Sequence, residues 1–352
     1  MPSGLSPPFK LGCDGNMTEP HFHGHAGVRI AGTGLGLPEG RLTNADLEKI
    51  MDTSDEWIVQ RTGIRERRKA DPDRESQVSM ATKALDAALA DAGMKGSDLD
   101  LVINGTCSPD STVPSGACRV AANVGATPAG AFDLVAACSS FVYALNVADT
   151  MVRSGRAKTV GVIGCEFLTR MMDYNDRRVS ILFGDGAGAA VVTADEDTRR
   201  GCLWQITEGD GRDWEKLYRP MDESQIPEWD RDNPIRPGCV RMSGQDIYRF
   251  AVTKFGEVIA SGLEATGLKS EDISQFLCHQ SNIRILQKAM ERNEIPDEKL
   301  RINIDRYGNT SAASVPIILH ELRSEGKLVA GDLAMFVAFG AGLTWAANVW
   351  RV

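Results

Sequence analysis

The sequence predicts an α/β fold in which mostly parallel sheets are covered by helices on both faces. Amphipathic helical segments alternate with short apolar strands, which is the pattern of buried parallel sheets. Two pairs of segments also recur at nearly the same spacing, which indicates an internal duplication. With 352 residues, 42% of them hydrophobic and 25% charged, the chain is long enough to bury a large core. We therefore expect a globular protein of two similar halves.

The first recurring pair is a helix that ends at a glycine before a short strand. Residues 77–92 (QVSMATKALDAALADA) precede GMKGSDLDLVINGTC, and residues 251–266 (AVTKFGEVIASGLEAT) precede GLKSEDISQFLCH. Gly93 and Gly267 end the two helices, because glycine readily adopts the left-handed conformation of a helix C-cap. The offset in numbering between these glycines is 267 − 93 = 174.

The second recurring pair begins at Cys138 and Asn309. The segments are CSSFVYALNVADTMVRSGRAKTVGVIG and NTSAASVPIILHELRSEGKLVAGDLAMFVAFG, and each reaches a helix-ending glycine, Gly155 or Gly326, after the same number of positions. The offset here is 309 − 138 = 171. If the halves pack about a pseudo-two-fold axis, we expect these helix starts to converge near strand ends, where α/β folds form their sites.

Cys138 is a candidate nucleophile. It lies in DLVAACSSFVYAL, where an apolar run turns through small residues into a helix. The unpaired N–H groups and the dipole at a helix start stabilise a thiolate, the nucleophilic form of cysteine. The competing interpretation is a small buried hydrophobic residue, as for most free cysteines. Of the five histidines only His279 falls at a predicted strand end, so we expect it to join Cys138 and Asn309.

The predicted organisation has three parts. Residues 1–26 form a flexible N-terminal extension, residues 27–200 the half with the nucleophile, and residues 201–352 the half with the histidine and the asparagine. Residues 210–237 are charged and proline-rich and contain two tryptophans. We expect this segment to cross the junction of the halves as a long, mobile excursion near the pocket.

Composition restricts location and partners. Residues 1–26 have neither the basic n-region nor the apolar h-region of a secretory signal. No apolar run reaches the roughly 18 residues expected of a membrane-spanning helix. We therefore expect a cytoplasmic protein without a membrane partner. The net charge of −9 disfavours wholesale binding to nucleic acid, although a local basic patch remains compatible with an acidic partner.

Motifs for metals and cofactors are weak. The eight cysteines are scattered without a C-x-x-C pair and predict neither a zinc site nor a disulfide framework. They are Cys13, Cys107, Cys118, Cys138, Cys165, Cys202, Cys239 and Cys278. GTGLGLPEG matches a dinucleotide-binding loop only loosely, because no ribose-binding acidic residue follows it in a βαβ context. The histidines of HFHGHA, in the N-terminal tail, are expected to bind metal only adventitiously. We predict no cofactor and no metal.

Six segments in a fixed order carry a family resemblance. They are TSDEWIVQRTGIRERR (53–68), AACSSF (136–141), ILFGDGAGAAVV (181–192), HQSNIRI (279–285), YGNTSAASVP (307–316) and FGAGLTWA (339–346). From about Val28 to Val352 the chain resembles β-ketoacyl-acyl carrier protein synthase III, the initiating condensing enzyme of type II fatty acid synthesis. The resemblance implies the thiolase-like fold, with the duplicated halves forming a layered α/β/α/β/α sandwich, and a cofactor-free homodimer.

The resemblance also implies that Cys138, His279 and Asn309 form a catalytic triad. Cys138 would take the acyl group of acyl-CoA as a thioester. His279 and Asn309 would donate hydrogen bonds to the thioester oxygen of malonyl-acyl carrier protein while carbon dioxide leaves. The backbone N–H groups of Cys138 and Ala341 would form the second oxyanion hole.

Further positions are implied to bind CoA or carrier protein. They are Trp57 and Arg177 around the adenine, Arg61 near the phosphates, and Arg249, Arg284 and Lys288 in a basic surface. Arg284, Lys288 and Arg292 recur at every fourth position and would share one helix face. The competing interpretation of these charges is an ordinary solvated face.

The implied primer pocket includes Val113 and Phe339. Val113 occupies a position that often carries a bulky aromatic residue reaching across the dimer, so we expect a longer or branched acyl primer. Two further departures are Ser140, where glycine is usual, and Ala341, in the middle of the usual FGGG. Each is expected to add bulk near the acyl carbonyl.

Other functions on the same fold remain open. A chalcone synthase-like polyketide synthase shares Cys, His and Asn but extends with malonyl-CoA. An acyl-CoA-dependent acyltransferase would load Cys138 without condensing, and a non-catalytic thiolase-fold binding protein would do neither. A thiolase usually needs a second cysteine in its C-terminal glycine loop, which FGAG lacks, and no motif matches the catalytic glutamate of a hydroxymethylglutaryl-CoA synthase.

Overall fold

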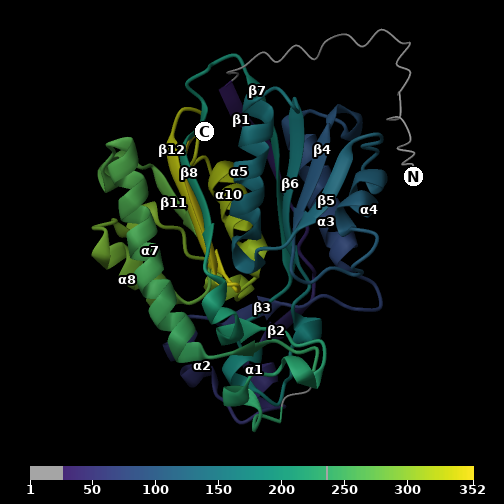
Figure 1. Cartoon of the computed structure of the whole chain (residues 1–352), viewed down its shortest axis with the longest axis vertical. Coiled ribbons are helices and arrows are strands. Elements are labelled where there is room, and N and C mark those ends of the chain that lie inside the picture. The colour runs from purple at the N-terminus through teal and green to yellow at the C-terminus, as the bar shows by residue number, and fades with distance from the viewer. Residues whose placement is uncertain (1–26, 235–236) are drawn as a thin grey trace, which may run out of the picture.

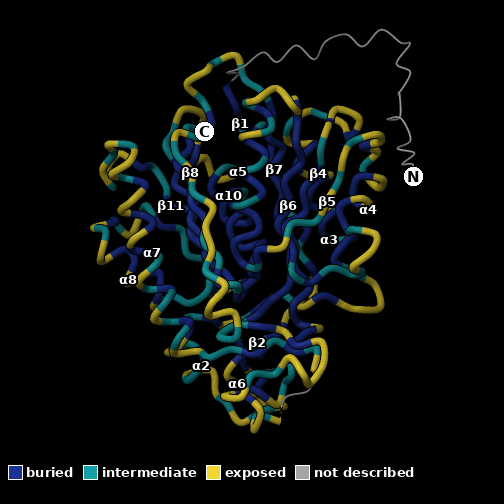
Figure 2. Tube along the Cα trace, in the orientation of Figure 1, coloured by how far each residue is buried: buried dark blue, intermediate teal, exposed yellow. Residues whose placement is uncertain are grey.

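Two β-sheets enclose a central pair of helices, and further helices cover the outer faces (Figure 1). The structure, a computed structural model, describes residues 27–234 and 237–352. Buried backbone follows both sheets and the central helices, whereas exposed backbone gathers in the outer loops (Figure 2). The predicted α/β/α/β/α sandwich is confirmed. The prediction of mostly parallel sheets is wrong, because only three of the seven strand pairings in the two main sheets of the described residues are parallel.

The first half forms a five-stranded sheet in the order β1-β7-β6-β4-β5. Its strands are β1 (Gly27–Leu35), β4 (Leu101–Gly105), β5 (Gly130–Leu134), β6 (Thr159–Glu166) and β7 (Gly186–Asp195). β4, β5 and β6 run parallel, and β7 is antiparallel to both of its neighbours. Every residue of β6 is buried, as expected for a strand covered on both faces.

The second half repeats this arrangement with one strand fewer, in the order β11-β12-β13-β8. Its strands are β8 (Gly201–Gly209), β11 (Gln275–Cys278), β12 (Leu333–Gly340) and β13 (Thr344–Arg351). β11 and β12 are parallel, and β13 is antiparallel to β12 and β8. These strands therefore correspond to β4, β6, β7 and β1, and the edge strand β5 has no counterpart strand in the described residues.

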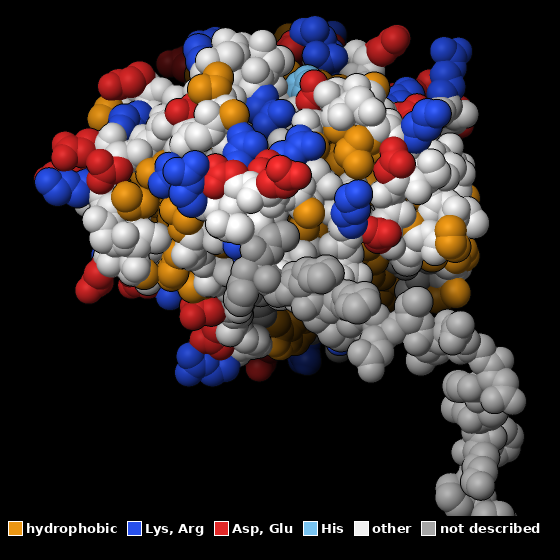
Figure 3. All heavy atoms as spheres, turned by 90° about the horizontal axis from the view of Figure 1, so that it is seen from above, with side chains coloured by type: hydrophobic (Ala, Val, Ile, Leu, Met, Phe, Trp, Pro, Cys, Tyr) orange, Lys and Arg blue, Asp and Glu red, His pale blue; other side chains and the backbone are white. Residues whose placement is uncertain are grey.

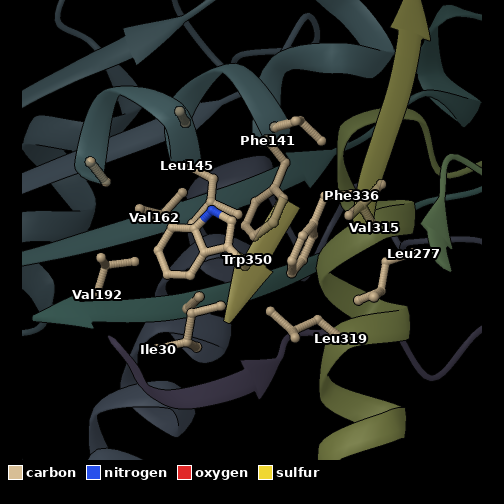
Figure 4. Close-up of a cluster of buried hydrophobic side chains, with 14 of the residues drawn as sticks. Ile30, Phe141, Leu145, Val162, Val192, Leu277, Val315, Leu319, Phe336 and Trp350 are labelled. Carbon is tan, nitrogen blue, oxygen red and sulfur yellow. The ribbon is translucent and has the colours of Figure 1, made fainter. Parts of the chain in front are cut away.

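Helices make up the other three layers. α5 (Ser140–Arg153) and α10 (Ser314–Ser324) lie between the sheets. α3 (Gln77–Ala92) and α4 (Gly116–Asn123) cover the outer face of the first sheet, and α7 (Gly244–Thr266) with α8 (Ile283–Arg292) covers that of the second (Figure 1). Phe141 of α5, Leu319 of α10 and the fully buried Trp350 of β13 fill the space between the sheets (Figure 4).

A single offset in numbering relates the two halves, and its value is 174. It separates the starts of β1 and β8 (201 − 27), of α5 and α10 (314 − 140), and of β6 and β12 (333 − 159). The predicted pairing of Cys138 with Asn309 is wrong, because α10 has 11 residues and α5 has 14. The offset of 171 aligns only the glycines after the helices, and the counterpart of Cys138 is Ala312.

Gly32 and Gly34 of β1, within GTGLGLPEG, allow α3 to approach the strand closely. A Cβ atom at these positions would lie only 2.3 and 2.4 Å from backbone oxygens of α3. Any side chain would force the helix away from the sheet. The motif therefore serves helix–strand packing.

Smaller elements gather at one end of the sandwich, the lower end in Figure 1. They include β2 (Arg41–Thr43), β3 (Glu66–Arg68), α1 (Asn44–Glu48), α2 (Asp55–Thr62) and α6 (Arg177–Ser180). A short helix, α9 (Ile304–Tyr307), precedes Asn309. A small hairpin is formed by β9 (Leu217–Tyr218), which pairs with β10 (Arg241–Met242).

The described part of the 210–237 excursion is held by a buried carboxylate. Asp230 accepts hydrogen bonds from Tyr218 Oη (2.8 Å) and Arg241 Nη1 (2.9 Å). Leu217 and Met242, one on each strand of this small hairpin, line the cavity described below. The predicted position of the excursion near the pocket is therefore correct.

Candidate active site

Cys138, His279 and Asn309 line one cavity of about 100 Å³. Cys138 lies in the 3₁₀ turn Ala137–Ser139 ahead of α5, and His279 directly follows β11. Asn309 precedes a second 3₁₀ turn, Ser311–Ala313, ahead of α10. Most of the remaining wall is apolar and includes Leu182, Phe183, Leu217, Met242, Ile247, Ile285 and Phe339. The structure thus brings the three predicted groups together from distant parts of the chain.

The turn that carries Cys138 is held by Ser140. Ala137 has a φ of 48°, which is unusual for a residue with a side chain. The Ser140 hydroxyl accepts from Ala136 N (2.9 Å) and lies 2.7 Å from Ala137 O, to which it donates. Ser140 is fully buried and is not part of the cavity wall, so the predicted bulk near the acyl carbonyl is wrong for this residue.

The FGAG loop lies against the same turn. A Cβ atom on Gly340 would lie 2.7 Å from Cys138 N, so only glycine allows this approach. The Thr344 hydroxyl lies 3.0 Å from Ala136 O and 3.1 Å from Ala341 O and links the loop to the turn. This link holds the loop with Gly340 beside the backbone N of Cys138.

Ser314 is the partner of His279. Its Oγ lies 2.7 Å from His279 Nδ1 and 2.8 Å from Ser311 O, and it has a single proton to donate. When that proton points to Ser311 O, Nδ1 carries the ring proton; when it points to Nδ1, the ring proton is on Nε2. Nε2 is buried and meets no hydrogen-bond partner among the described residues. The hydroxyl therefore selects whether Nε2 accepts or donates.

Burial determines the charge of His279. It lowers the pKa of the imidazole to about 3, so the ring is neutral at physiological pH. Phe339 contributes to this apolar environment, with its ring centroid 5.4 Å from that of the imidazole. The predicted pocket residue Phe339 thus lies at the cavity and against the histidine.

Asn309 is oriented by the backbone. Its Oδ1 accepts a hydrogen bond from Ser311 N (2.8 Å), which leaves the Nδ2 amide as the donor end of the side chain. The sequence did not single out Ser311 or Ser314. A usable signal was present in TSAAS, since these serines follow Ala137 and Ser140 by the same offset as the rest of the duplication.

Cys138 differs from the prediction in its protonation. Burial raises the pKa of its thiol to about 12, a hydrogen bond from the Ser311 hydroxyl lowers it, and the nearby Glu166 carboxylate raises it. Burial therefore outweighs the stabilisation of the thiolate that the helix start predicts, and the raised pKa favours the thiol at rest.

Comparisons with known proteins agree over more than nine-tenths of the chain. Residues 132–211 match the family model described as 3-oxoacyl-[acyl-carrier-protein] synthase III, and residues 263–352 match its C-terminal model. A β-ketoacyl-[acyl-carrier-protein] synthase III of Caldanaerobacter subterraneus subsp. tengcongensis is 46% identical over 320 residues, which cover 91% of this chain and 96% of the relative. The chain belongs to the β-ketoacyl-acyl carrier protein synthase III family.

Solved structures of synthase III relatives have the same fold. The enzyme of Aquifex aeolicus VF5 has a TM-score of 0.85 at 46% identity, over 93% of this chain and 100% of its own. The priming β-ketosynthase of the R1128 polyketide pathway has the same score at 33% identity, over 94% and 97%. Membership of the synthase III family makes this chain a condensing enzyme of the acyltransferase class.

The predicted CoA-binding residues lie together at the end of the sandwich where the smaller elements gather. The guanidinium of Arg61 lies 4.6 Å from the centroid of the Trp57 ring, and that of Arg177 lies 5.1 Å from it. Arg177 also bonds to Asp52. An aromatic base between Trp57 and Arg177 would replace their direct stacking.

The residues of the predicted basic surface differ in how far they are engaged by other groups of the chain. Arg284 donates to Gln60 O (2.7 Å), and Arg292 lies along α7, where its Cδ would be 2.4 Å from a Cβ on Gly256. Lys288 pairs with Glu291, and Arg249 lies 3.9 Å from Asp246, yet their side chains are 56% and 74% exposed. Arg249 and Lys288 are therefore the members most available to a partner.

The remaining predicted positions fall outside the cavity. Val113 is 84% exposed and does not reach the cavity of its own chain.

The HFHGHA run lies outside the described residues. In residues 27–234 and 237–352, no cluster of His, Cys, Asp and Glu is arranged to hold a metal ion. No described helix is both long and apolar enough to cross a membrane. At the upper end of the sandwich, Lys and Arg are interspersed with Asp and Glu (Figure 3).

Proposed function

We propose that the chain catalyses the initiating condensation of an acyl-CoA primer with malonyl-acyl carrier protein through an acyl-Cys138 intermediate. The convergence of a thiol, an imidazole and an oriented amide in one small apolar cavity carries this proposal. Neither half could supply all three groups alone, since the thiol comes from the first half and the other two from the second.

In the loading step, Cys138 Sγ attacks the thioester carbon of acyl-CoA. A new C–S bond forms, the bond to CoA breaks, and the thiol proton leaves with CoA as its thiol. The N–H groups of Cys138 and Ala341 stabilise the tetrahedral oxyanion. Because Cys138 rests as a thiol, this proton transfer is part of the step.

In the condensation step, the bond between the malonyl carboxylate and its α-carbon breaks and carbon dioxide leaves. The electron pair of that bond remains on the α-carbon and forms an enolate. Asn309 Nδ2 and His279 Nε2, in the tautomer that carries a proton there, donate to the enolate oxygen. The carbanion attacks the acyl-Cys138 carbon, and the Cys138 sulfur leaves and takes up a proton. Decarboxylation supplies the carbanion, so this chemistry calls for no cofactor.

Intact-protein mass spectrometry tests the proposal. The protein is incubated with acetyl-, branched or longer acyl-CoA and then with malonyl-acyl carrier protein. We expect a mass gain on Cys138 that disappears as β-ketoacyl carrier protein forms. C138S should abolish the gain, whereas H279A should load and then fail to condense. An acyl group that persists would contradict condensation and indicate an acyltransferase; extension from malonyl-CoA instead of carrier protein would indicate a chalcone synthase-like enzyme.

We also propose that the chain acts as a cytoplasmic homodimer, with acyl carrier protein as its macromolecular partner. Strand β5 ends the first sheet, and Phe132 on it is 40% exposed. Val135, directly after this strand, is 73% exposed, and Val113 is 84% exposed. An open strand edge with exposed apolar side chains favours pairing with a second copy. The cytoplasm is where acyl-CoA and carrier protein are available.

A further inference from the structure

Glu166 is a buried carboxylate that takes no part in the loading and condensation steps described above. It is the last residue of β6 and is fully buried. Its oxygens lie 2.5 Å from Ser108 Oγ, 3.2 Å from Thr106 Oγ1 and 3.2 Å from Cys107 N, all in the loop after β4. The Cys107 thiol also lies 3.3 Å from Glu166 Oε1, and the fifth group, Ser311 Oγ at 3.0 Å, belongs to the other half of the chain.

The duplication explains why this carboxylate meets Ser311. Glu166 and Gly340 end the equivalent strands β6 and β12 and are related by the same offset as the two halves. Each faces the 3₁₀ turn of the opposite half: Gly340 approaches Cys138 N, and Glu166 binds Ser311. Ser311 is also the counterpart of Ala137, and both have positive φ, 50° and 48°. The second turn is thus fastened by the side chain of the residue that ends β6, whereas the equivalent residue at the end of β12 is a glycine.

Ser311 contacts all three members of the triad. Its N–H donates to Asn309 Oδ1 (2.8 Å), and its carbonyl lies 2.8 Å from the hydroxyl of Ser314, the partner of His279. Its hydroxyl reaches both Glu166 and the Cys138 thiol. A shift of this one residue would therefore move the amide donor and change the environment of the imidazole.

We propose that Glu166 is a positioning residue for the condensation step: by holding the Ser311 hydroxyl across the junction of the halves, it fixes the Asn309 amide and the Ser314–His279 pair. The proposal rests on the condensation proposed above and adds a fourth buried group to it. Glu166 acts through Ser311 and does not touch the substrates.

The carboxylate has a second, electrostatic effect that makes the proposal testable. Burial raises the pKa of the Glu166 carboxyl above its ordinary value, whereas the hydroxyl and amide donors around its two oxygens lower it and favour the ionised form, which accepts and does not donate. Its negative charge raises the pKa of the Cys138 thiol, whereas the Ser311 hydroxyl lowers it. Loss of the charge and loss of the hydroxyl should therefore shift the thiol pKa in opposite directions.

The test compares E166Q, S311A and S108A after pre-loading each protein with the acyl group. Ser108 and Ser311 are both 1% exposed and each offers a hydroxyl to the same carboxylate, but only Ser311 continues to Asn309. Single-turnover condensation with malonyl-acyl carrier protein should fall about 10²-fold in S311A and E166Q, the order of one lost oxyanion donor. S108A should lose less than about threefold, because the Asn309 donor stays in place.

The pH dependence of Cys138 alkylation separates positioning from general damage. E166Q should lower the thiol pKa and S311A should raise it, although both slow condensation. Equal losses in S108A and S311A, or unchanged condensation in S311A, would overturn the proposal. If E166Q does not fold, as judged by circular dichroism, the serine pair still decides. Failure of the wild-type protein to condense would refute the function instead of the role of Glu166.

Discussion

The Cys138 thiol is buried beside the Ser311 hydroxyl and the Glu166 carboxylate. Its pKa of about 12 follows mainly from burial, because a low-dielectric site disfavours the thiolate. Sequence position predicted the nucleophile but not its protonation, since a helix start is visible in sequence and desolvation is not. For the protonation of this residue, the loss of solvent on folding therefore has the largest effect.

Reactivity of Cys138 should reflect this raised pKa. We expect its alkylation by iodoacetamide to rise about tenfold per pH unit from pH 7 to pH 10, because the thiolate fraction grows throughout that range. Peptide mapping by mass spectrometry follows Cys138 separately from the exposed Cys118. A plateau below pH 9 would show that the site stabilises the thiolate after all.

The neutral His279 should make stability depend on pH. Its pKa is about 3 in the folded protein against an ordinary value of 6.5, so the unfolded chain binds the additional proton between these values. Stability is therefore fully present above pH 6.5 and falls by about 1.4 kcal/mol per pH unit as the pH decreases towards 3. Urea unfolding at pH 7 and pH 5 should show a smaller loss in H279Q than in the wild type. Equal losses would contradict a neutral buried ring.

At the level of elements, the two central helices begin with the same device. The hydroxyls of Ser140 and Ser314 lie 2.7 and 2.8 Å from the carbonyl oxygen of a positive-φ residue three positions earlier. In α10 the serine also contacts His279, whereas in α5 it braces the nucleophile turn. The same local structure thus positions different chemistry in the two halves.

Replacing Ser314 should impair condensation selectively. Without the hydroxyl, the remaining neighbour of Nδ1 is the Ser311 carbonyl, which keeps the ring proton on Nδ1 and removes the donor at Nε2. We expect S314A to load acyl-CoA but to condense about 10²–10³ times more slowly. S314T, which retains a hydroxyl, should recover much of the rate. Loss of loading to the same extent would point to a collapsed turn instead of a tautomer effect.

The exposed cations of α7 and α8 should govern carrier-protein association. K288E and R249E are expected to raise the KM for malonyl-acyl carrier protein about fivefold at low salt, since each reverses one positive charge at the rim. K327E serves as the control, because Lys327 is similarly exposed but follows the far end of α10. The difference should shrink as salt is added. Equal effects of all three variants would mean that overall charge, and not this surface, matters.

For the whole molecule, the duplication creates the site. Strand order and strand direction agree between the halves, so each half presents a turn to the strand end of the other. One junction holds Cys138 against Gly340, and the second holds Ser311 against Glu166. The two halves share the same arrangement of strands, and the function of the site depends on the positions at which their residues differ.

The unmatched edge strand β5 should carry the dimer contact. The wild-type protein should behave in light scattering as a particle of twice its 38.1 kDa chain mass, and F132K should shift it towards the monomer. L203K is the matched control, because Leu203 lies on β8, the edge of the other sheet, and is 45% exposed against 40% for Phe132. Dissociation by both variants, or a monomeric wild type, would contradict this interface.

Sequence by itself determined the duplicated α/β architecture, the family, and the residues that meet in the cavity. Periodicity, glycine caps and ordered motifs are local properties, so Gly93 and Gly267 already give the true offset. Tertiary structure decided which residues of the turns correspond, because the shorter α10 brings Gly326 three positions closer to its helix start than Gly155, so that counting back from the glycines wrongly matches Asn309 with Cys138. It also decided the protonation of Cys138 and the partners Ser311, Ser314 and Glu166. Desolvation and hydrogen bonds between residues far apart in the chain arise only when the halves pack together.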